Sequence, residues 1–299
     1  MEISVVIPTY NRMEDLERCL SALERQSIPM KRFEVIVVDG GSSDATLDLL
    51  DSFRRKGRLD LSYHVERKRG AAAARNLGIK KARGGIIAFT DDDCVPSEGW
   101  LSELSGAFPQ DGRCAGVGGI VVPLEDRLIP RYLHVRRAGR GVGFGTRAIH
   151  LATTNAMYRR SALLDVGCFN DRMIIGEDID LSQRILRKGY YLKSFDSGLV
   201  RHRYVTDVKG LYRKSFLHGT GLATAAGLQG KALDMGWMAL FRNLISPRSY
   251  SDRYGGDKKR GLYEQTAFAM LHRVQMIGFH DGYRSESRKR SHLKEIDSQ

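Results

Sequence analysis

Apolar, β-favouring runs alternate with amphipathic helical patterns through the first 93 residues, and this alternation limits the fold more than any other feature. The runs occupy residues 3–7, 34–38, 61–65 and 86–89. Helices are expected to begin at Asn11, with Glu14 completing a capping box, and at Ser43 or Asp44. A third helix is expected over 70–81. Strand–helix–strand order of this kind predicts a parallel, doubly wound α/β sheet that binds ligands at the carboxyl ends of its strands.

Three consecutive acids, Asp91, Asp92 and Asp93, directly follow the fourth run. Their like charges repel, and a protein core does not absorb them unpaired. A divalent cation with oxygen ligands, Mg²⁺ or Mn²⁺, would hold them together at the sheet edge where a nucleotide's phosphates bind. The alternative is a turn with solvated acids. An EF-hand calcium loop is excluded, because its closing glutamate is absent.

Three further motifs place polar side chains where a strand or helix meets a turn. Asp39 ends the second run and can accept a hydrogen bond from a nucleotide base or ribose, or simply shape the turn. Arg75 lies in an alanine-rich helix and can bind phosphate through two bonds, or lie on the surface. Glu177 and Asp178 open a helix, where one acid can cap it while the other acts as a general base, unless both only cap.

Composition limits the class of protein. The chain has 299 residues, of which 42% are apolar and 28% charged, as in a globular protein. No window approaches the ~20 apolar residues of a membrane span, and the chain begins with a strand rather than a signal sequence. We therefore expect a cytoplasmic protein. Its cysteines fit no zinc or disulfide spacing, so we expect a reduced compartment and no structural metal. These cysteines are Cys19, Cys94, Cys114 and Cys168.

The net charge of +13 is unevenly distributed. Residues 1–200 hold 30 basic and 26 acidic side chains, whereas residues 201–299 hold 18 basic and 9 acidic. A basic C-terminal third indicates either an anionic partner surface or a solvated tail. Apolar residues around 233–245 and 267–277 predict amphipathic helices that lie on a membrane interface or pack against the rest of the protein. Residues 284–299 are polar and are expected to fray.

The segment between the acid run and the Glu177 motif is less regular. Residues 115–123 predict one strand, in which Gly118 and Gly119 allow another part of the chain to approach closely. Residues 127–147 hold six arginines, no acid and alternating glycines, a composition typical of a loop. That loop is either a lid that meets phosphates when substrate binds or an exposed turn region.

Five motifs, taken in order, resemble family 2 glycosyltransferases with the GT-A fold. They are Pro8-Thr9-Tyr10-Asn11, the Asp39 turn, Ala74-Arg75-Asn76, Asp91-Asp92-Asp93 and Gly176-Glu177-Asp178. The resemblance covers about residues 2–204. It implies a Rossmann-like, doubly wound mixed sheet flanked by helices. Residues 1–93 would form the nucleotide-binding half and 94–204 the acceptor and catalytic half, followed by a basic helical extension over 205–299.

The resemblance also implies roles for single residues. The donor nucleotide, commonly a uridine nucleotide, would be held by Pro8, Thr9, Tyr10, Asn11, Asp39, Asp91 and Asp92. Arg75 would contact the diphosphate or help seat the base. Asp91 and Asp93 match the acid-x-acid motif, with Asp91 nearer the ribose and Asp93 on Mn²⁺ or Mg²⁺. His202 matches a histidine that adds a metal ligand in some members. Asp178, beside Glu177, matches the catalytic base.

Two departures from the family pattern are visible. Gly40 stands where many members carry a second acid, which leaves Asp39 as the acid of that pair. No Gln-x-x-Arg-Trp motif follows Asp178, which argues against a processive polysaccharide synthase.

The predicted function is transfer of a sugar from a nucleotide-sugar, with UDP-sugar as the expected donor, to an acceptor sugar or lipid-linked sugar in cell-envelope synthesis. A nucleotidyltransferase would need a glycine-rich basic loop after the first strand, where this chain has Pro8-Thr9-Tyr10-Asn11-Arg12. A nucleic-acid-binding protein lacks support, because aromatic residues are not interleaved with the basic runs. The basic C-terminal third suggests that the protein is cytoplasmic and peripheral at the inner face of the plasma membrane. A non-catalytic protein that binds nucleotides or an anionic surface remains the alternative.

Overall fold

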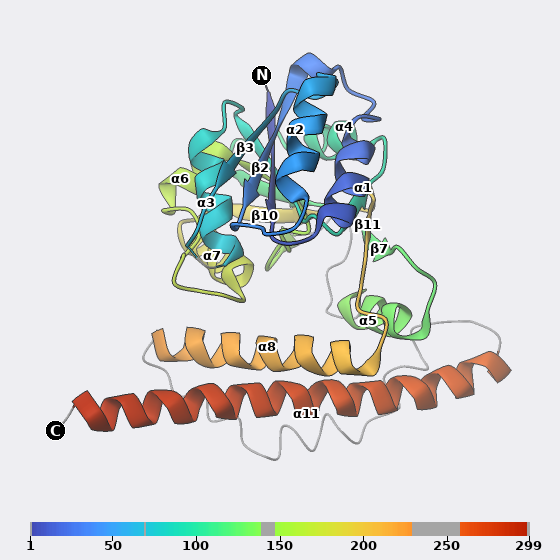
Figure 1. The fold of residues 1–299 in the computed structure, drawn as a ribbon, viewed down its shortest axis with the longest axis vertical. Helices are drawn as coiled ribbons and strands as arrows, with labels where there is room; N and C mark the ends of the chain where they lie inside the picture. Colours follow the sequence, from blue (N-terminus) through green and yellow to red (C-terminus); the bar gives the residue numbers. More distant parts are fainter. Residues whose placement is uncertain (1, 69, 139–146, 229–257, 298–299) are drawn as a thin grey trace. The chain divides into compact units, whose positions relative to one another are not determined.

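The computed structural model describes residues 2–68, 70–138, 147–228 and 258–297 (Figure 1). The chain divides into two compact units. The first, here called the sheet unit, comprises Met1–Leu124 and Arg137–Arg203, and the second, here called the helical unit, comprises Glu125–Arg136 and Tyr204–Gln299. The boundary near residue 204 lies where the glycosyltransferase resemblance ends.

A mixed sheet with strand order β3-β2-β1-β4-β9-β6-β10-β8 forms the centre of the sheet unit. Its strands are β1 (Ile3–Thr9), β2 (Phe33–Asp39), β3 (Leu61–Val65), β4 (Ile86–Thr90), β6 (Cys114–Gly118), β8 (Arg147–Ala148), β9 (Asn155–Arg159) and β10 (Tyr191–Ser194). The expected parallel pairing holds for β1 to β4, whereas β9 runs antiparallel to both β4 and β6. The mixed GT-A type of sheet is thereby confirmed, with the expected parallel strands in its first half.

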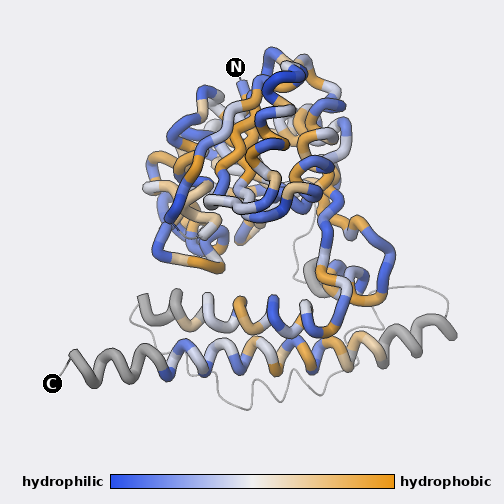
Figure 2. The backbone as a smooth tube through the Cα atoms, in the orientation of Figure 1, coloured by the Kyte–Doolittle hydropathy of each residue, from blue (hydrophilic) through white to orange (hydrophobic). Residues whose placement is uncertain are grey.

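Helices cover both faces of this sheet (Figure 1). They are α1 (Met13–Leu23), α2 (Thr46–Lys56), α3 (Ala71–Lys81), α4 (Trp100–Gly106), α6 (Arg160–Asp165) and α7 (Glu177–Arg187). Successive strand residues point to opposite faces, so Val5 packs in the cluster formed with α1, α2 and α4, while Val6 packs with α3, α6 and α7. The strands are the most hydrophobic part of this unit (Figure 2), as expected for strands buried on both faces.

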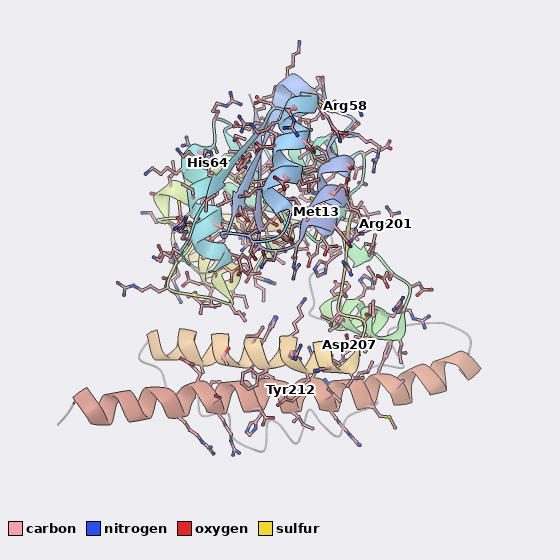
Figure 3. All side chains as sticks on the ribbon, viewed as in Figure 1. Met13, Arg58, His64, Arg201, Asp207 and Tyr212 are labelled. Carbon is pink, nitrogen blue, oxygen red and sulfur yellow. The ribbon has the colours of Figure 1, made fainter. Side chains whose placement is uncertain are left out.

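The loops after β1 and β2 hold each other, and this corrects the expected helix caps. Helix α1 begins at Met13 rather than after an Asn11 cap; Asn11 has a φ of 51° and its side chain accepts the Ser43 amide instead. The Met13 amide, at the start of α1 (Figure 3), donates to Asp44 from the other loop. Asp44 also accepts the Thr46 amide, and α2 begins at Thr46, after Ala45 rather than after a Ser43 or Asp44 cap. Contacts between loops replace the local capping box.

The run at 115–123 is two strands rather than one. Strand β6 lies in the large sheet, whereas β7 (Val121–Pro123) belongs to a second sheet of order β5-β11-β7 with β5 (Cys94–Pro96) and β11 (Val200–His202). Gly118 and Gly119 mark the change of sheet. A side chain at Gly119 would overlap the Gly198 carbonyl, which confirms the expected close approach.

Part of the expected basic loop at 127–147 is helical. Helix α5 spans Leu128–Ala138, because Ile129 and Tyr132 share one face and are buried against apolar residues of the helical unit. The neighbouring acids Glu125 and Asp126 pair with Arg127 and Arg131. The expectation of a loop is therefore wrong for 128–138. Residues 139–146 lie outside the described part, so the lid stays a prediction there.

The helical unit contains α8 (Val208–Leu228) and α11 (Lys258–Asp297), which run side by side (Figure 1). Gly278 contacts Tyr212 and Gly282 contacts Phe216, so residue numbers rise together and the helices are parallel. The Tyr212 hydroxyl also donates to Asp281 (2.7 Å; Figure 3). Helix α11 continues to Asp297, so the expected fraying from residue 284 is wrong within the described chain. The expected apolar helix at 233–245 lies outside the described residues.

Among the described helices, none combines the length and the apolar character needed to cross a bilayer.

Candidate active site

The carboxyl ends of β1, β2 and β4 meet at one edge of the sheet, because these strands are parallel neighbours. Thr9 and Asp39 are paired at the ends of β1 and β2, and the three acids follow Thr90 at the end of β4. Loops from well-separated parts of the sequence therefore come together here. This edge is where doubly wound sheets bind ligands.

Arg12 neutralises two of the three acids. Its Nη1 donates to Asp93 Oδ2 (2.6 Å) and to Asp92 Oδ1 (3.2 Å). Asp92 also accepts the Thr9 hydroxyl (2.9 Å), and burial raises the pKa of Asp92 to about 7 against the opposing charge of Arg12. Burial works against ionisation of Asp93 too, but His202 and Arg12 outweigh it and hold the pKa of this carboxyl well below its usual range. Asp93 is thus the firmly ionised acid of the pair.

Asp93, His202 and Cys94 form the cluster that fits a metal ion best within the described chain. Strand register places His202 opposite Cys94, and His202 Nε2 lies 3.2 Å from Asp93 Oδ1. One ligand atom from each of the three residues lies within 4.8 Å of the others. Burial and the charges of Asp91 and Asp93 raise the pKa of the Cys94 thiol well above its usual value, so it stays protonated. Carboxylate oxygen and imidazole nitrogen are the stronger donors, a pair suited to Mn²⁺.

Asp91 does not belong to this cluster, because both of its oxygens have other partners. Arg75 Nη2 donates to Oδ1 (2.7 Å) and the Thr154 hydroxyl donates to Oδ2 (3.1 Å). The other arm of Arg75, Nη1, donates to Glu177 (2.7 Å). The Arg75 side chain is only 4% exposed. Burial works against its charge, but Asp91 and Glu177 outweigh burial and raise the pKa of Arg75. Arg75 therefore joins the end of β4 to the start of α7.

The two acids at the start of α7 have different surroundings. Glu177 is buried beside Arg75, and burial raises its pKa despite the arginine. Asp178 is partly exposed and accepts the Ile179 amide at 2.8 Å, and its Oδ2 lies 3.9 Å from His150 Nε2. The helix begins after Gly176, which has a φ of 82°. Glu177 thus has a structural partner, whereas the Asp178 side chain is 23% exposed to solvent.

Asp39 shapes its own turn. Its buried carboxylate accepts the amides of Gly41 (3.1 Å) and Ser42 (2.8 Å) and the Ser42 hydroxyl. The neighbouring Tyr10 ring is 59% exposed, and a side chain at Gly40 would lie 3.3 Å from it. The glycine that departs from the family pattern therefore leaves room beside an exposed aromatic ring.

Most residues singled out in the sequence gather at this edge, but Arg12, Thr154 and the Cys94 thiol were not assigned a role there. The closeness of Arg12 to the acids could have been expected, because the loops after two neighbouring parallel strands, β1 and β4, lie at the same edge of the sheet. Thr154 comes just before β9, and its contact with Asp91 depends on strand order. Nothing local to its sequence indicates that contact.

Comparison with known proteins agrees with this geometry. The sequence profile described as "Glycosyl transferase family 2" matches residues 4–167, more than half of the chain. The chain belongs to glycosyltransferase family 2. The glycosyltransferase AglE of Haloferax volcanii is 31% identical over 223 residues, which cover 73% of this chain and 72% of AglE.

Solved structures share the fold. The mannosyltransferase PcManGT from Pyrobaculum calidifontis, in complex with GDP-Man and Mn²⁺, matches 96% of this chain and 86% of its own with a TM-score of 0.64 and 19% identity. Residues 1–349 of Staphylococcus aureus TarS, in complex with UDP-GlcNAc, match 98% of this chain and 92% of that one with a TM-score of 0.52 and 19% identity. By sequence, TarS, a poly(ribitol-phosphate) β-N-acetylglucosaminyltransferase, is 28% identical over 171 residues, 55% of this chain and 29% of TarS. These likenesses establish the GT-A type of fold.

Proposed function

We propose that this family 2 glycosyltransferase transfers a sugar, with inversion, from a UDP-sugar to an acceptor hydroxyl. One observation supports this most strongly. Five side chains meet at one edge of the sheet unit: Asp91 and Asp93 after β4, Arg75 on α3, Asp178 on α7 and His202 on β11. A cation site and an accessible carboxylate at such an edge are what transfer from a nucleoside diphosphate requires.

The donor would lie along the loops after β1 and β2. The exposed Tyr10 ring can stack on the base, while the loop from Pro8 to Asn11 lines the same side. Asp39 holds the turn beside the base, and its hydrogen bonds to Gly41 and Ser42 favour a positioning role. Asp91 and Asp92 would face the ribose. TarS binds UDP-GlcNAc and PcManGT binds GDP-Man, so the choice of uridine rests on the sequence resemblance.

A divalent ion, Mn²⁺ or Mg²⁺, fits Asp93 and His202, whose ligand atoms are 3.2 Å apart and can share one ion. When bound, such an ion neutralises charge on the departing diphosphate. Asp91 would support the site through Arg75 and Thr154 rather than as a direct ligand. The buried Arg75 reaches the donor only if one of its two carboxylate bonds opens, so we assign it a positioning role.

Asp178 is the proposed general base. It takes the proton of the acceptor hydroxyl, the freed oxygen forms a bond to the anomeric carbon, and the bond from that carbon to the diphosphate breaks. The nucleoside diphosphate leaves with the electron pair, and one displacement inverts the anomeric centre. Glu177 would hold Arg75 and thereby fix the start of α7. Without a Gln-x-x-Arg-Trp motif, we propose a single transfer per binding event.

Binding of donor and metal should disappear together when Asp93 is changed. Titration calorimetry with UDP, GDP and their sugar derivatives, with and without Mn²⁺, should show metal-dependent binding of one nucleotide. Asp93→Ala should weaken that binding at least ~10-fold, because the charged metal ligand is removed. Asp171→Ala, which removes an acid that pairs with Lys68, should bind as the unchanged protein does. Absence of nucleotide binding by the folded protein would instead favour the non-catalytic alternative.

The helical unit is proposed to bind anionic lipid at the inner face of the plasma membrane, where a lipid-linked acceptor for cell-envelope synthesis would be found. Two observations support this proposal. Residues 201–299 carry 18 basic and 9 acidic side chains, and Leu217, Met270 and Ile277 are exposed on α8 and α11.

Liposome flotation tests the membrane proposal. We expect the protein to float with vesicles that contain phosphatidylglycerol and to stay behind with pure phosphatidylcholine. Because each basic residue near an anionic surface contributes ~1 kcal/mol, raising the salt concentration should release it. Equal and negligible flotation with both kinds of vesicle would contradict the proposal.

A further inference from the structure

We propose that Arg12 is a built-in counter-cation that the metal ion must displace, so that the metal binds tightly only together with the nucleoside diphosphate. The inference rests on the proposed metal site at Asp93 and His202. It adds a control on that site by a side chain outside the acid motif.

In the structure, the positive charge of Arg12 is already paired with two of the three acids. One guanidinium nitrogen, Nη1, bonds both Asp93 Oδ2 at 2.6 Å and Asp92 Oδ1 at 3.2 Å. The opposite oxygen of Asp93, Oδ1, faces His202 Nε2. An ion bound between Asp93 and His202 would therefore share its carboxylate with a full positive charge. Two cations on one carboxylate repel each other, so Arg12 opposes metal binding as long as it stays in place.

Arg12 is placed so that it can leave. Its side chain is 47% exposed, whereas those of Asp92 and Asp93 are 8% and 15% exposed. The backbone on either side is held separately, because Asn11 bonds Ser43 and the Met13 amide bonds Asp44. The long side chain can thus swing without moving the loop. Moving Arg12 away from the acids costs free energy, because the largely buried pair Asp92 and Asp93 would lose its counter-charge.

Binding of the donor would supply that compensation. A diphosphate at the carboxyl edge of the sheet offers oxygen acceptors that match a guanidinium well. When metal and diphosphate arrive together, the metal neutralises Asp93 while Arg12 gains a new anionic partner. When metal arrives alone, Arg12 loses its partners and gains only water. Metal and nucleotide should therefore strengthen each other's binding through Arg12, and each should do so by the same factor.

Electron paramagnetic resonance of free Mn²⁺ measures this directly on the full chain, without UDP and with saturating UDP, corrected for Mn²⁺ bound by UDP in buffer. Arg12→Met should bind Mn²⁺ alone about three- to tenfold more tightly than the unchanged protein, the range expected for a partly exposed ion pair. The factor by which UDP tightens Mn²⁺ binding should shrink correspondingly. Arg32→Met is the matched control: Arg32 is 47% exposed and pairs with Glu2 just before β1, at the opposite end of that strand from the acid run. Its Mn²⁺ affinity should stay within about twofold of the unchanged protein.

Loss of Arg12 also leaves two acids without their counter-charge, so the variant's fold needs its own check. Arg12→Gln removes the charge but retains an amide donor for Asp92 and Asp93, and it should tighten Mn²⁺ binding in the same direction. In both variants Mn²⁺ should raise the melting temperature more than it does in the unchanged protein. A folded variant at Arg12 that binds Mn²⁺ no more tightly than the unchanged protein overturns the inference.

Asp93→Asn separates this failure from failure of the metal site. If Asp93→Asn abolishes Mn²⁺ binding while the Arg12 variants bind Mn²⁺ as the unchanged protein does, only the counter-cation role of Arg12 is contradicted. If Asp93→Asn binds Mn²⁺ normally, the metal site itself is wrong, and the role of Arg12 falls with it.

Discussion

Replacing Asp178 by asparagine is expected to remove most sugar transfer while leaving donor binding unchanged. A general base typically contributes ~10²–10⁴-fold to rate, and asparagine keeps the shape and the hydrogen bond from the Ile179 amide but cannot take a proton. The loss should appear in kcat, because Asp178 is expected to act on the acceptor rather than on the nucleotide. Release of nucleoside diphosphate in the presence of acceptor measures the rate, and calorimetry measures donor affinity.

A control for this substitution comes from an acid outside the site. Asp171→Asn makes the same chemical change at a position that pairs with Lys68 on the surface, and its rate should be that of the unchanged protein. Normal transfer by Asp178→Asn would show that the base lies elsewhere. A loss of donor binding alongside the loss of rate would place Asp178 on the nucleotide instead.

Removing Arg75 is expected to produce the largest loss of stability among single substitutions at the site. Its guanidinium joins Asp91 to Glu177 at 2.7 Å each and is almost completely buried. Removing one partner of a buried ion pair costs about 3–5 kcal/mol, because the remaining charge is left uncompensated. Arg75→Met keeps most of the packing over the Phe169 ring and removes the charge. Urea or thermal unfolding of Arg75→Met should therefore show a fall in the free energy of unfolding of about that size.

Two variants test the origin of the loss. Arg54→Met removes an exposed arginine that lies 3.6 Å from Asp51, and it should change stability by less than about 0.5 kcal/mol. In the Arg75→Met background, Glu177→Gln should restore part of the stability, because it removes one uncompensated acid. A negligible effect of Arg75→Met, or no recovery in the double variant, would mean that the three side chains do not act as one buried network.

The strand ends and their acids could be predicted because both depend on local patterns. The apolar runs at 3–7, 34–38 and 86–89 stop within two residues of Thr9, Asp39 and Thr90, where β1, β2 and β4 end. The alternation with helices then predicts a shared carboxyl edge. The pairing of Arg12 with Asp92 and Asp93 depends instead on side-chain geometry across two neighbouring strands. Local periodicity holds no information on which rotamer closes that contact.

The sequence-based predictions were wrong where contacts between distant segments outweigh local preference. Helix α5 forms in an arginine-rich segment because Tyr132 is buried among Leu211 and Phe268, which lie 79 and 136 residues further along the chain. Asn11 has the sequence of a helix cap, yet its side chain accepts the Ser43 amide from the next loop. In both cases a tertiary contact outweighs the local preference, whose contribution is about 1 kcal/mol.

The sequence alone predicted the alternating α/β architecture, the carboxyl edge as the expected ligand site, and the acids and Arg75 that gather there, since each depends on patterns within a few residues. Only the tertiary structure decided which of those groups are partners. It separates Asp91, held by Arg75 and Thr154, from Asp93, which faces His202 across β5 and β11 and Arg12 across β1 and β4. Three adjacent aspartates look equivalent along the chain. Successive side chains point in different directions, however, and each meets different partners in the folded protein.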